Sequence, residues 1–204
     1  MRMVILKRIG IFGGAFNPVH LGHLAAAQAA RERFGLDKVI FIPSCRSPHK
    51  TAGFPVSAEN RLRMVRLAIA GNPFFGVSDV EIARGGKSYT VDTIKHFRKI
   101  LPARTKLYFI VGEDSFSQLK TWESIDEILT LAACIVVNRP GYTVSVSGLK
   151  HVTATMPGID ISSSFLRQRL KQGKSVRYLV PESVFKYIEK KRLYKNVNEK
   201  RSLK

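Results

Sequence analysis

Residues 9–24 read IGIFGGAFNPVHLGHL, and the rest of the chain is arranged around this stretch. Residues 9–12 are a short apolar run of the kind that forms a buried strand. Two glycines follow, where we expect the chain to turn and a ligand to approach bare backbone. After a second turn at an Asn-Pro pair, the Ala-rich residues 21–34 predict a helix. A strand, a glycine-rich turn and a helix N-terminus together form an architecture that binds phosphate groups.

Two histidines stand where this helix begins. His20 and His23 are three residues apart, so both fall on one face of the first helical turn and point toward the space that the glycines leave open. Two imidazoles beside a phosphate cradle favour chemistry on a phosphoryl group. The alternatives are half of a metal site or a plain tight turn. His49, His96 and His151 are scattered, without the Cys or carboxylate spacing of a zinc site.

The following residues predict an α/β fold. An apolar strand at 38–43 follows the helix, and a strand–helix–strand unit implies a parallel sheet with a right-handed crossover. Further strands are predicted at 75–82, 106–111, 132–137 and near Val152. Further helices are predicted to begin after Ser57, at 91 and within 159–167, and a final helix follows residues 178–181 and runs to about 194. We expect Ser57 and Thr90 to cap two of these helices. The basic residues Arg61, Arg63 and Arg66 between apolar positions read as a solvated helix face.

This pattern predicts a Rossmann-like parallel sheet flanked by helices, with a small C-terminal helical cap. The expected organisation is one domain over residues 1–194, with the helical part at about 159–194. Residues 195–204 form a basic tail that we expect to be disordered.

The charge balance is unusual for a chain of 204 residues. Thirty-four Lys and Arg against fifteen acids give a net charge of +19, which favours anionic partners such as nucleotides, nucleic acid or a membrane surface. The sequence contains no run of eighteen apolar residues, so no transmembrane helix is expected. Residues 1–8 are too short and too charged to be expected to form a signal peptide. Cys45 and Cys134 read as reduced, structural thiols. These observations predict a cytoplasmic protein.

Residues 13–23, GGAFNPVHLGH, resemble the signature of the nucleotidyltransferase superfamily that carries an HxGH motif. The GGxFxPxHxGH form resembles that of the nicotinate-nucleotide adenylyltransferases. Further segments are similar to the same family: SPHK at 47–50, SYTVDT at 88–93, the spacing GxDx(4)Lx(2)W at 112–122, and ISSSFLR at 161–167. The resemblance covers about residues 8–194. The chain departs from the family pattern at Ser44-Cys45, where relatives often carry Asn, and at Glu113, where a small residue is usual.

The resemblance implies transfer of AMP from ATP to nicotinate mononucleotide, which forms nicotinate adenine dinucleotide and pyrophosphate in NAD biosynthesis. The implied catalytic residues are His20, His23 and Arg167. The implied ATP-binding residues are Gly13, Gly14, Phe16, His20, Gly22, His23, Gly112, Asp114, Ile161, Ser163 and Arg167. The implied mononucleotide-binding residues are Lys50, Tyr89, Thr90, Trp122 and Arg139. No protein metal site is expected, and Mg²⁺ would be carried by the ATP phosphates.

Other functions stay open on the sequence alone. A sister nucleotidyltransferase could act on nicotinamide mononucleotide or on phosphopantetheine, although the latter group usually lacks the SYTVDT segment and Trp122. A non-specific nucleic-acid-binding protein would fit the charge, but the sequence has no interleaved aromatic–basic repeats. The expected partners are therefore ATP and nicotinate mononucleotide, with no specific nucleic acid and no membrane. A homo-oligomer is left open.

Overall fold

The computed structural model describes residues 8–46, 55–139 and 148–195. In this part of the chain, six strands form one sheet in the order β3-β2-β1-β4-β5-β6, and every neighbouring pair is parallel. The strands are β1 (Arg8–Gly14), β2 (Lys38–Pro43), β3 (Phe75–Val77), β4 (Lys106–Gly112), β5 (Ala133–Asn138) and β6 (His151–Thr155). This strand order reverses between β1 and β4, and in such sheets ligands bind in the crevice outside the carboxyl ends of the strands at that reversal.

The central strands are apolar on both faces because both faces of the sheet are covered. In β1, Ile9 and Ile11 face one hydrophobic cluster and Phe12 faces the other, and all three are buried. Ile11 lies opposite Ile40 of β2 and Phe109 of β4, so the register stacks apolar residues across the middle of the sheet. Near-continuous apolar strands of this kind are typical of parallel sheets buried on both sides.

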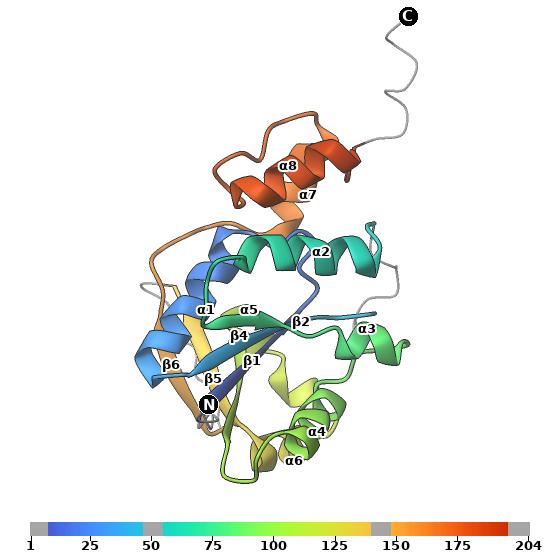
Figure 1. Ribbon diagram of the computed structural model, residues 1–204. Coiled ribbons are helices and arrows are strands. Elements are labelled where there is room, and N and C mark those ends of the chain that lie inside the picture. The colour runs from blue at the N-terminus through green and yellow to red at the C-terminus, as the bar shows by residue number, and fades with distance from the viewer. Residues whose placement is uncertain (1–7, 47–54, 140–147, 196–204) are drawn as a thin grey trace, which may run out of the picture.

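Helices cover the two faces of the sheet, as Figure 1 shows. One hydrophobic cluster takes in residues of α1 (Leu21–Phe34), α2 (Ala58–Ile69), α7 (Ser163–Lys171) and α8 (Glu182–Lys191). The other takes in residues of α4 (Thr90–Ile100) and α6 (Ile125–Leu131). Short helical turns connect these layers: α3 (Val80–Arg84), α5 (Glu113–Phe116) and a 3₁₀ turn, η1 (Leu119–Thr121). None of the helices in the described ranges is long and apolar enough to cross a membrane.

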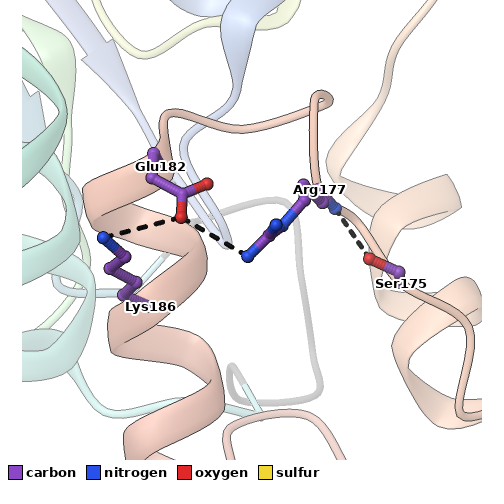
Figure 2. Close-up of polar contacts among 4 residues, drawn as sticks. All are labelled: Ser175, Arg177, Glu182 and Lys186. Carbon is purple, nitrogen blue, oxygen red and sulfur yellow. Dashed lines mark hydrogen bonds and ion pairs between the residues drawn. The ribbon is translucent and has the colours of Figure 1, made fainter.

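The two C-terminal helices are joined to each other and to the body of the molecule. Figure 2 shows the link between them, in which Glu182 at the start of α8 pairs with Arg177 at 3.5 Å and with Lys186 at 3.7 Å. In the same connection, the Arg177 backbone N–H donates to Ser175 Oγ at 3.1 Å. α8 packs on α2, and its Ser183 hydroxyl donates to the carbonyl of Leu67 at 3.0 Å. The expected C-terminal helical cap is therefore present.

The predicted α/β fold is confirmed, and three local predictions are wrong. The strand expected at 75–82 ends at Val77, because the Ser78 hydroxyl accepts a hydrogen bond from the Val80 N–H and the helix α3 begins there. The glycine pair at 13–14 does not turn but ends β1, and the positive φ of 45° falls on Phe16. Thr90 does not cap α4 either: Tyr89 occupies the cap position, and Thr90 is the first helical residue. The expected tail lies largely outside the described residues, of which Lys195 is the last.

Candidate active site

A cavity of about 860 Å³ opens at the carboxyl edge of the sheet. The ends of β1, β4 and β5 form its floor, and the first turns of α1, α4 and α7 form its rim. Several chain segments that are distant in sequence therefore converge on one space, at the strand-order reversal where α/β sheets bind ligands. Its volume is in the range of cofactor sites in proteins.

The two histidines lie together in this cavity. His20 is the N-cap residue of α1 and is 5% exposed, while His23 is half-buried one turn later. Their ring centroids are 3.7 Å apart, and the His20 backbone N–H donates to His23 Nδ1 at 3.2 Å. Both rings line the cavity, as the spacing of the two residues predicted.

Burial lowers the pKa of both imidazoles. It lowers the pKa of His20 to about 4, with a further lowering by the positive charge of Arg139. The pKa of His23 is well below its usual value, because burial and the neighbouring His20 both disfavour its charged form. Both rings are therefore neutral at pH 7 in the free protein. A neutral imidazole carries one N–H donor, and a bound polyanion would favour its protonated form.

The glycines of the first motif leave room at the cavity floor. A Cβ added to Gly13 would meet nothing within 4 Å, so the missing side chain leaves open space beside the strand end. A Cβ on Gly22 would lie 3.1 Å from His20 Nδ1 and would displace that ring. The missing side chain of Gly13 therefore leaves space for a ligand, whereas that of Gly22 leaves space for the ring of His20. Gly14 also lines the cavity, and its missing side chain makes room for Phe16.

Phe16 lies in the core and is not among the residues that line the cavity. Its ring is 1% exposed and meets the ring of His23 edge-on, with 5.1 Å between the centroids. It also contacts Phe12 at 5.6 Å in a T-shaped arrangement. Such edge-to-face pairs fix the orientation of both rings. In the free protein, Phe16 therefore supports His23 from behind.

The second serine-rich motif begins α7 and is tied to the first motif. Ser162 caps the helix by accepting from the Phe165 N–H at 3.2 Å, and the Ser163 hydroxyl donates to the Pro18 carbonyl at 2.9 Å. Arg167 donates to the Asn17 carbonyl and to Ser164 Oγ, both at 2.9 Å. Ile161 and Ser163 line the cavity, whereas Arg167 is not among the lining residues. These bonds hold the two motifs side by side.

The remaining implied ligand residues occupy other walls of the cavity. Tyr89 and Thr90 line it at the start of α4, and Trp122 lines it directly after η1, with its ring 6.5 Å from that of Phe109. Gly112 and Asp114 line it at the end of β4. Arg139 lines it after β5 and pairs with Asp160 at 2.6 Å. Lys50 and the rest of the SPHK segment lie outside the described residues. The two departures from the family pattern, Ser44 and Glu113, both face this space.

One important residue was misread from the sequence. Arg61 was expected on a solvated face, but it is 1% exposed, and its guanidinium donates to the Ala15 carbonyl at 2.8 Å and to the Cys45 carbonyl at 3.2 Å. It therefore braces the backbone just beyond the glycine pair against the segment after β2. The helical phase carries the signal, because Arg61 shares its face with Met64 and Val65, three and four positions on, and both are fully buried.

A second residue of the cavity wall, Glu81, was not identified at all. Its side chain is 5% exposed and lines the cavity beside the start of α4. The Thr93 hydroxyl donates to Glu81 Oε1 at 2.6 Å. Burial raises the pKa of this carboxyl, although hydrogen bonds from Thr93 and Ser88 act in the opposite direction. It was missed because the segment around it was predicted as a strand.

The described part of the chain contains no group of three or more His, Cys, Asp or Glu side chains placed to hold a metal ion. The cavity offers hydrogen-bond donors, the cation of Arg139 and an aromatic wall at Trp122, and four acidic side chains also line it: Glu81, Glu113, Asp114 and Glu123. The donors, the cation and the aromatic wall suit polyanionic ligands that carry rings.

A parallel sheet of this strand order, with two imidazoles over a glycine strand end at its carboxyl edge, defines a nucleotide-binding α/β protein. Comparison with known proteins narrows this class. Residues 11–169 match the cytidylyltransferase-like family. Among solved structures, the nicotinic acid mononucleotide adenylyltransferase of Plasmodium falciparum, in complex with NaAD, superimposes with a TM-score of 0.77 at 19% identity. That alignment covers 92% of this chain and 97% of the Plasmodium chain, and it shows a shared fold.

Curated relatives are similar over nearly the whole chain. A probable nicotinate-nucleotide adenylyltransferase of Desulfitobacterium hafniense is 45% identical over 200 residues, which covers 93% of this chain and 96% of the relative. A protein of the same description from Thermus thermophilus is 45% identical over 188 residues, covering 92% of this chain and all of the relative. The chain belongs to the nicotinate-nucleotide adenylyltransferase family.

Proposed function

We propose that this protein transfers the adenylyl group of ATP to nicotinate mononucleotide and releases pyrophosphate. The observation that carries the proposal is the cavity itself. It brings the two adjacent histidines together with Trp122 and the N-terminus of α4. One space thus offers donors for a polyphosphate and a platform for a ring that bears a negative charge. Family membership supports the same reaction.

The reaction needs no nucleophile from the protein. A phosphate oxygen of the mononucleotide attacks the α-phosphorus of ATP, a new P–O bond forms, and the bond from the α-phosphorus to the bridging oxygen of pyrophosphate breaks. Charge grows on the non-bridging and leaving oxygens, so catalysis is positioning plus electrostatic stabilisation. In the proposal, His20 and His23 donate to the α- and β-phosphates. Gly13 and Gly14 let the backbone approach the triphosphate.

The α7 motif is proposed to hold the far end of ATP. The hydroxyl of Ser163 and the backbone at Ile161 face the cavity and would contact the nucleotide. Arg167 holds Asn17 and Ser164 with two of its N–H groups, and the guanidinium N–H groups that these bonds leave are our proposed donors to the leaving pyrophosphate. Gly112 and Asp114 are proposed to contact the ribose of the nucleotide.

The mononucleotide is proposed to bind between α4 and Trp122. The indole can stack on the pyridine ring, and the backbone N–H groups at Tyr89 and Thr90 lie at the positive end of the α4 dipole, which suits the ring carboxylate. Arg139 lines the same cavity and is our proposed contact for the mononucleotide phosphate, together with Lys50.

Magnesium is proposed to enter with ATP. The described residues form no cluster of metal ligands, so the ATP phosphates would bind the ion, which would neutralise part of their charge. We further propose that residues 1–194 form one domain, because residues of α7 and α8 share a hydrophobic cluster with the sheet. A cytoplasmic location is proposed as well. The two free thiols, of Cys45 and Cys134, support it, since disulfides are rare in that compartment. The homo-oligomer stays open.

Substrate preference is the decisive experiment. We expect purified protein with ATP and Mg²⁺ to convert nicotinate mononucleotide at least ten-fold more efficiently than the amide, measured as kcat/KM by chromatography of the dinucleotide. An amide would place an NH₂ group against backbone donors and lose a contact worth about 1–3 kcal/mol. A loss of about 1.4 kcal/mol corresponds to a ten-fold lower kcat/KM. Equal turnover of the amide would contradict the carboxylate site. Turnover of phosphopantetheine alone would overturn both substrate assignments.

A further inference from the structure

Glu81 is a buried acidic side chain in the cavity wall for which the proposed chemistry has no use. It lies on α3, and it lines the cavity together with Ser88, Tyr89, Thr90 and Thr93. Burying a carboxyl group is costly unless hydrogen bonds compensate it. The contacts of this carboxyl therefore indicate what it does for the site.

Glu81 and Ser88 connect three segments of the wall. Thr93, one turn inside α4, donates its hydroxyl proton to Glu81 Oε1 at 2.6 Å. Ser88, just before α4, lies near enough to the carboxyl to lower its pKa, and the Ser88 Oγ accepts from the Cys45 N–H at 2.9 Å. Glu81 thus joins α3 to the first turn of α4, and Ser88 joins the residue before that turn to the segment after β2.

The start of α4 depends on such outside support. Tyr89 at the N-cap position makes no side-chain hydrogen bond to the helix, so the usual capping interaction is missing there. Thr93, which follows Tyr89 and Thr90 on the first turn, bonds to Glu81, and Ser88, which precedes them, lowers the pKa of the same carboxyl. Arg84 adds a bond to Thr93 Oγ1 at 3.4 Å. The first turn of α4 is therefore held from α3.

We propose that Glu81 is a positioning residue for the mononucleotide half of the cavity, where it holds the N–H groups at Tyr89 and Thr90 in place for the pyridine carboxylate. This inference rests on the proposed function of the same site. Charge-assisted hydrogen bonds to a substrate need the donors in place before binding, and a small displacement of a helix end weakens them. The ATP half of the cavity is built from other elements and does not depend on Glu81.

A direct role would have the opposite consequence. If the carboxylate of Glu81 faced the pyridine carboxylate across the cavity, the two like charges would repel each other. Replacing Glu81 by Gln would then tighten the binding of nicotinate mononucleotide. A positioning role predicts weaker binding instead, because Gln keeps one acceptor oxygen but brings an NH₂ group against hydroxyls that now donate. The direction of the change separates the two roles.

The only tryptophan of the chain makes a direct binding measurement practical. Trp122 lines the cavity, so its fluorescence reports nicotinate mononucleotide binding without turnover. We expect Kd for nicotinate mononucleotide to rise about ten-fold in Thr93→Val and at least ten-fold in Glu81→Ala, with a smaller rise in Glu81→Gln. Kd for ATP and kcat at saturating substrate should change less than three-fold. The double variant Glu81→Ala with Thr93→Val should be no weaker than Glu81→Ala, because both remove the same bond.

Glu182→Gln is the matched control, since this exposed acid lies on the C-terminal cap and should leave both affinities unchanged. Thermal unfolding shows which variants are folded. If Glu81→Ala does not fold, the Kd values of Thr93→Val and Glu81→Gln test the positioning role instead. Unchanged or tighter mononucleotide binding in these two variants would overturn the inference. Equal losses for ATP and mononucleotide would also overturn it. A wild-type protein that neither binds nor converts nicotinate mononucleotide would instead overturn the proposed function, and the inference with it.

Discussion

At the scale of single residues, the two neighbouring histidines have different structural roles. His20 caps α1 and is almost fully buried, whereas His23 lies one turn later, half-buried and backed by Phe16. The His20 backbone also donates to the His23 ring, so that bond leaves the other ring nitrogen of His23, Nε2, as the protonated one. His23 is therefore oriented as a donor toward the cavity.

Removing this donor should slow the reaction without unfolding the protein. We expect His23→Ala to lower kcat by about 10²–10³, the usual cost of losing one group that stabilises transition-state charge. His96→Ala is the matched control, because His96 lies on α4 and is not part of the cavity lining. Steady-state kinetics with ATP and nicotinate mononucleotide measure the effect. A His23→Ala protein with most of its activity would disprove the assignment.

The lowered pKa of His20 predicts how stability depends on pH. Between pH 6.5 and about 4 the unfolded chain binds a proton at this position and the folded protein does not. Stability rises with pH wherever the unfolded state holds more protons, so acidification over this window should lower the free energy of unfolding. His20 alone would contribute about 3 kcal/mol, because each ten-fold difference in proton affinity between the folded and unfolded states corresponds to about 1.4 kcal/mol.

Urea unfolding of the wild type and of His20→Gln at pH 7, 5.5 and 4 isolates this effect. The difference in stability between the two proteins should shrink as the pH falls. The raised pKa of Glu81 acts in the opposite sense, because its stabilisation is lost as the pH rises through its folded pKa, and it is common to both proteins. A difference that stays constant with pH would contradict the burial of a neutral His20.

At the scale of elements, the phase of α2 decides which of its arginines matters. Arg61 points inward and bonds the backbone at Ala15 and Cys45, whereas Arg63 is exposed. The hydrophobic period alone indicated an amphipathic helix, but it did not show that the buried stripe includes a cation. The two carbonyls of Ala15 and Cys45 accept hydrogen bonds from the guanidinium and help to make an arginine acceptable there.

We expect Arg61→Ala to lower the free energy of unfolding by about 2–6 kcal/mol, since two carbonyl acceptors lose a charged donor at roughly 1–3 kcal/mol each. Arg63→Ala, two positions along the same helix, should change it by less than about 0.5 kcal/mol. Chemical denaturation of both variants gives the comparison. Similar stabilities would mean that the contacts of Arg61 contribute nothing net.

The same reasoning explains how far the sequence could predict this molecule. The motif at 13–23 and the apolar runs were enough for the parallel sheet and for the two histidines, because their signals are local. The roles of Arg61 and Glu81 could not be predicted because they depend on partners that are distant in sequence. The carbonyl of Ala15, for example, is 46 positions away from Arg61. The placement of Phe16 behind His23 likewise depends on a positive φ at Phe16, which the sequence pattern does not predict.

At the scale of the whole molecule, the net charge of +19 exceeds what the proposed reaction requires. Residues 181–204 hold eight basic and three acidic residues, so most of the excess lies on the body of the protein. Deleting residues 196–204 should therefore leave kcat and KM unchanged and weaken non-specific polyanion binding. Turnover assays and the salt dependence of binding to a random oligonucleotide test this. Loss of turnover in the truncated protein would assign the tail a role in the site.

Two contacts tie the C-terminal helical cap to the first motif and the start of α1. The hydroxyl of Tyr194 donates to Asn17 Oδ1 at 2.6 Å, 177 positions apart, and the Leu21 N–H at the start of α1 donates to the Leu179 carbonyl at 3.1 Å. Synthesis on the ribosome runs from the N-terminus, so residues 179–194 emerge after the first motif. A nascent chain can therefore pair its early strands while its first motif still lacks the two hydrogen bonds to Tyr194 and Leu179. We therefore expect the first motif to be fully braced only after residues 179–194 have folded onto it.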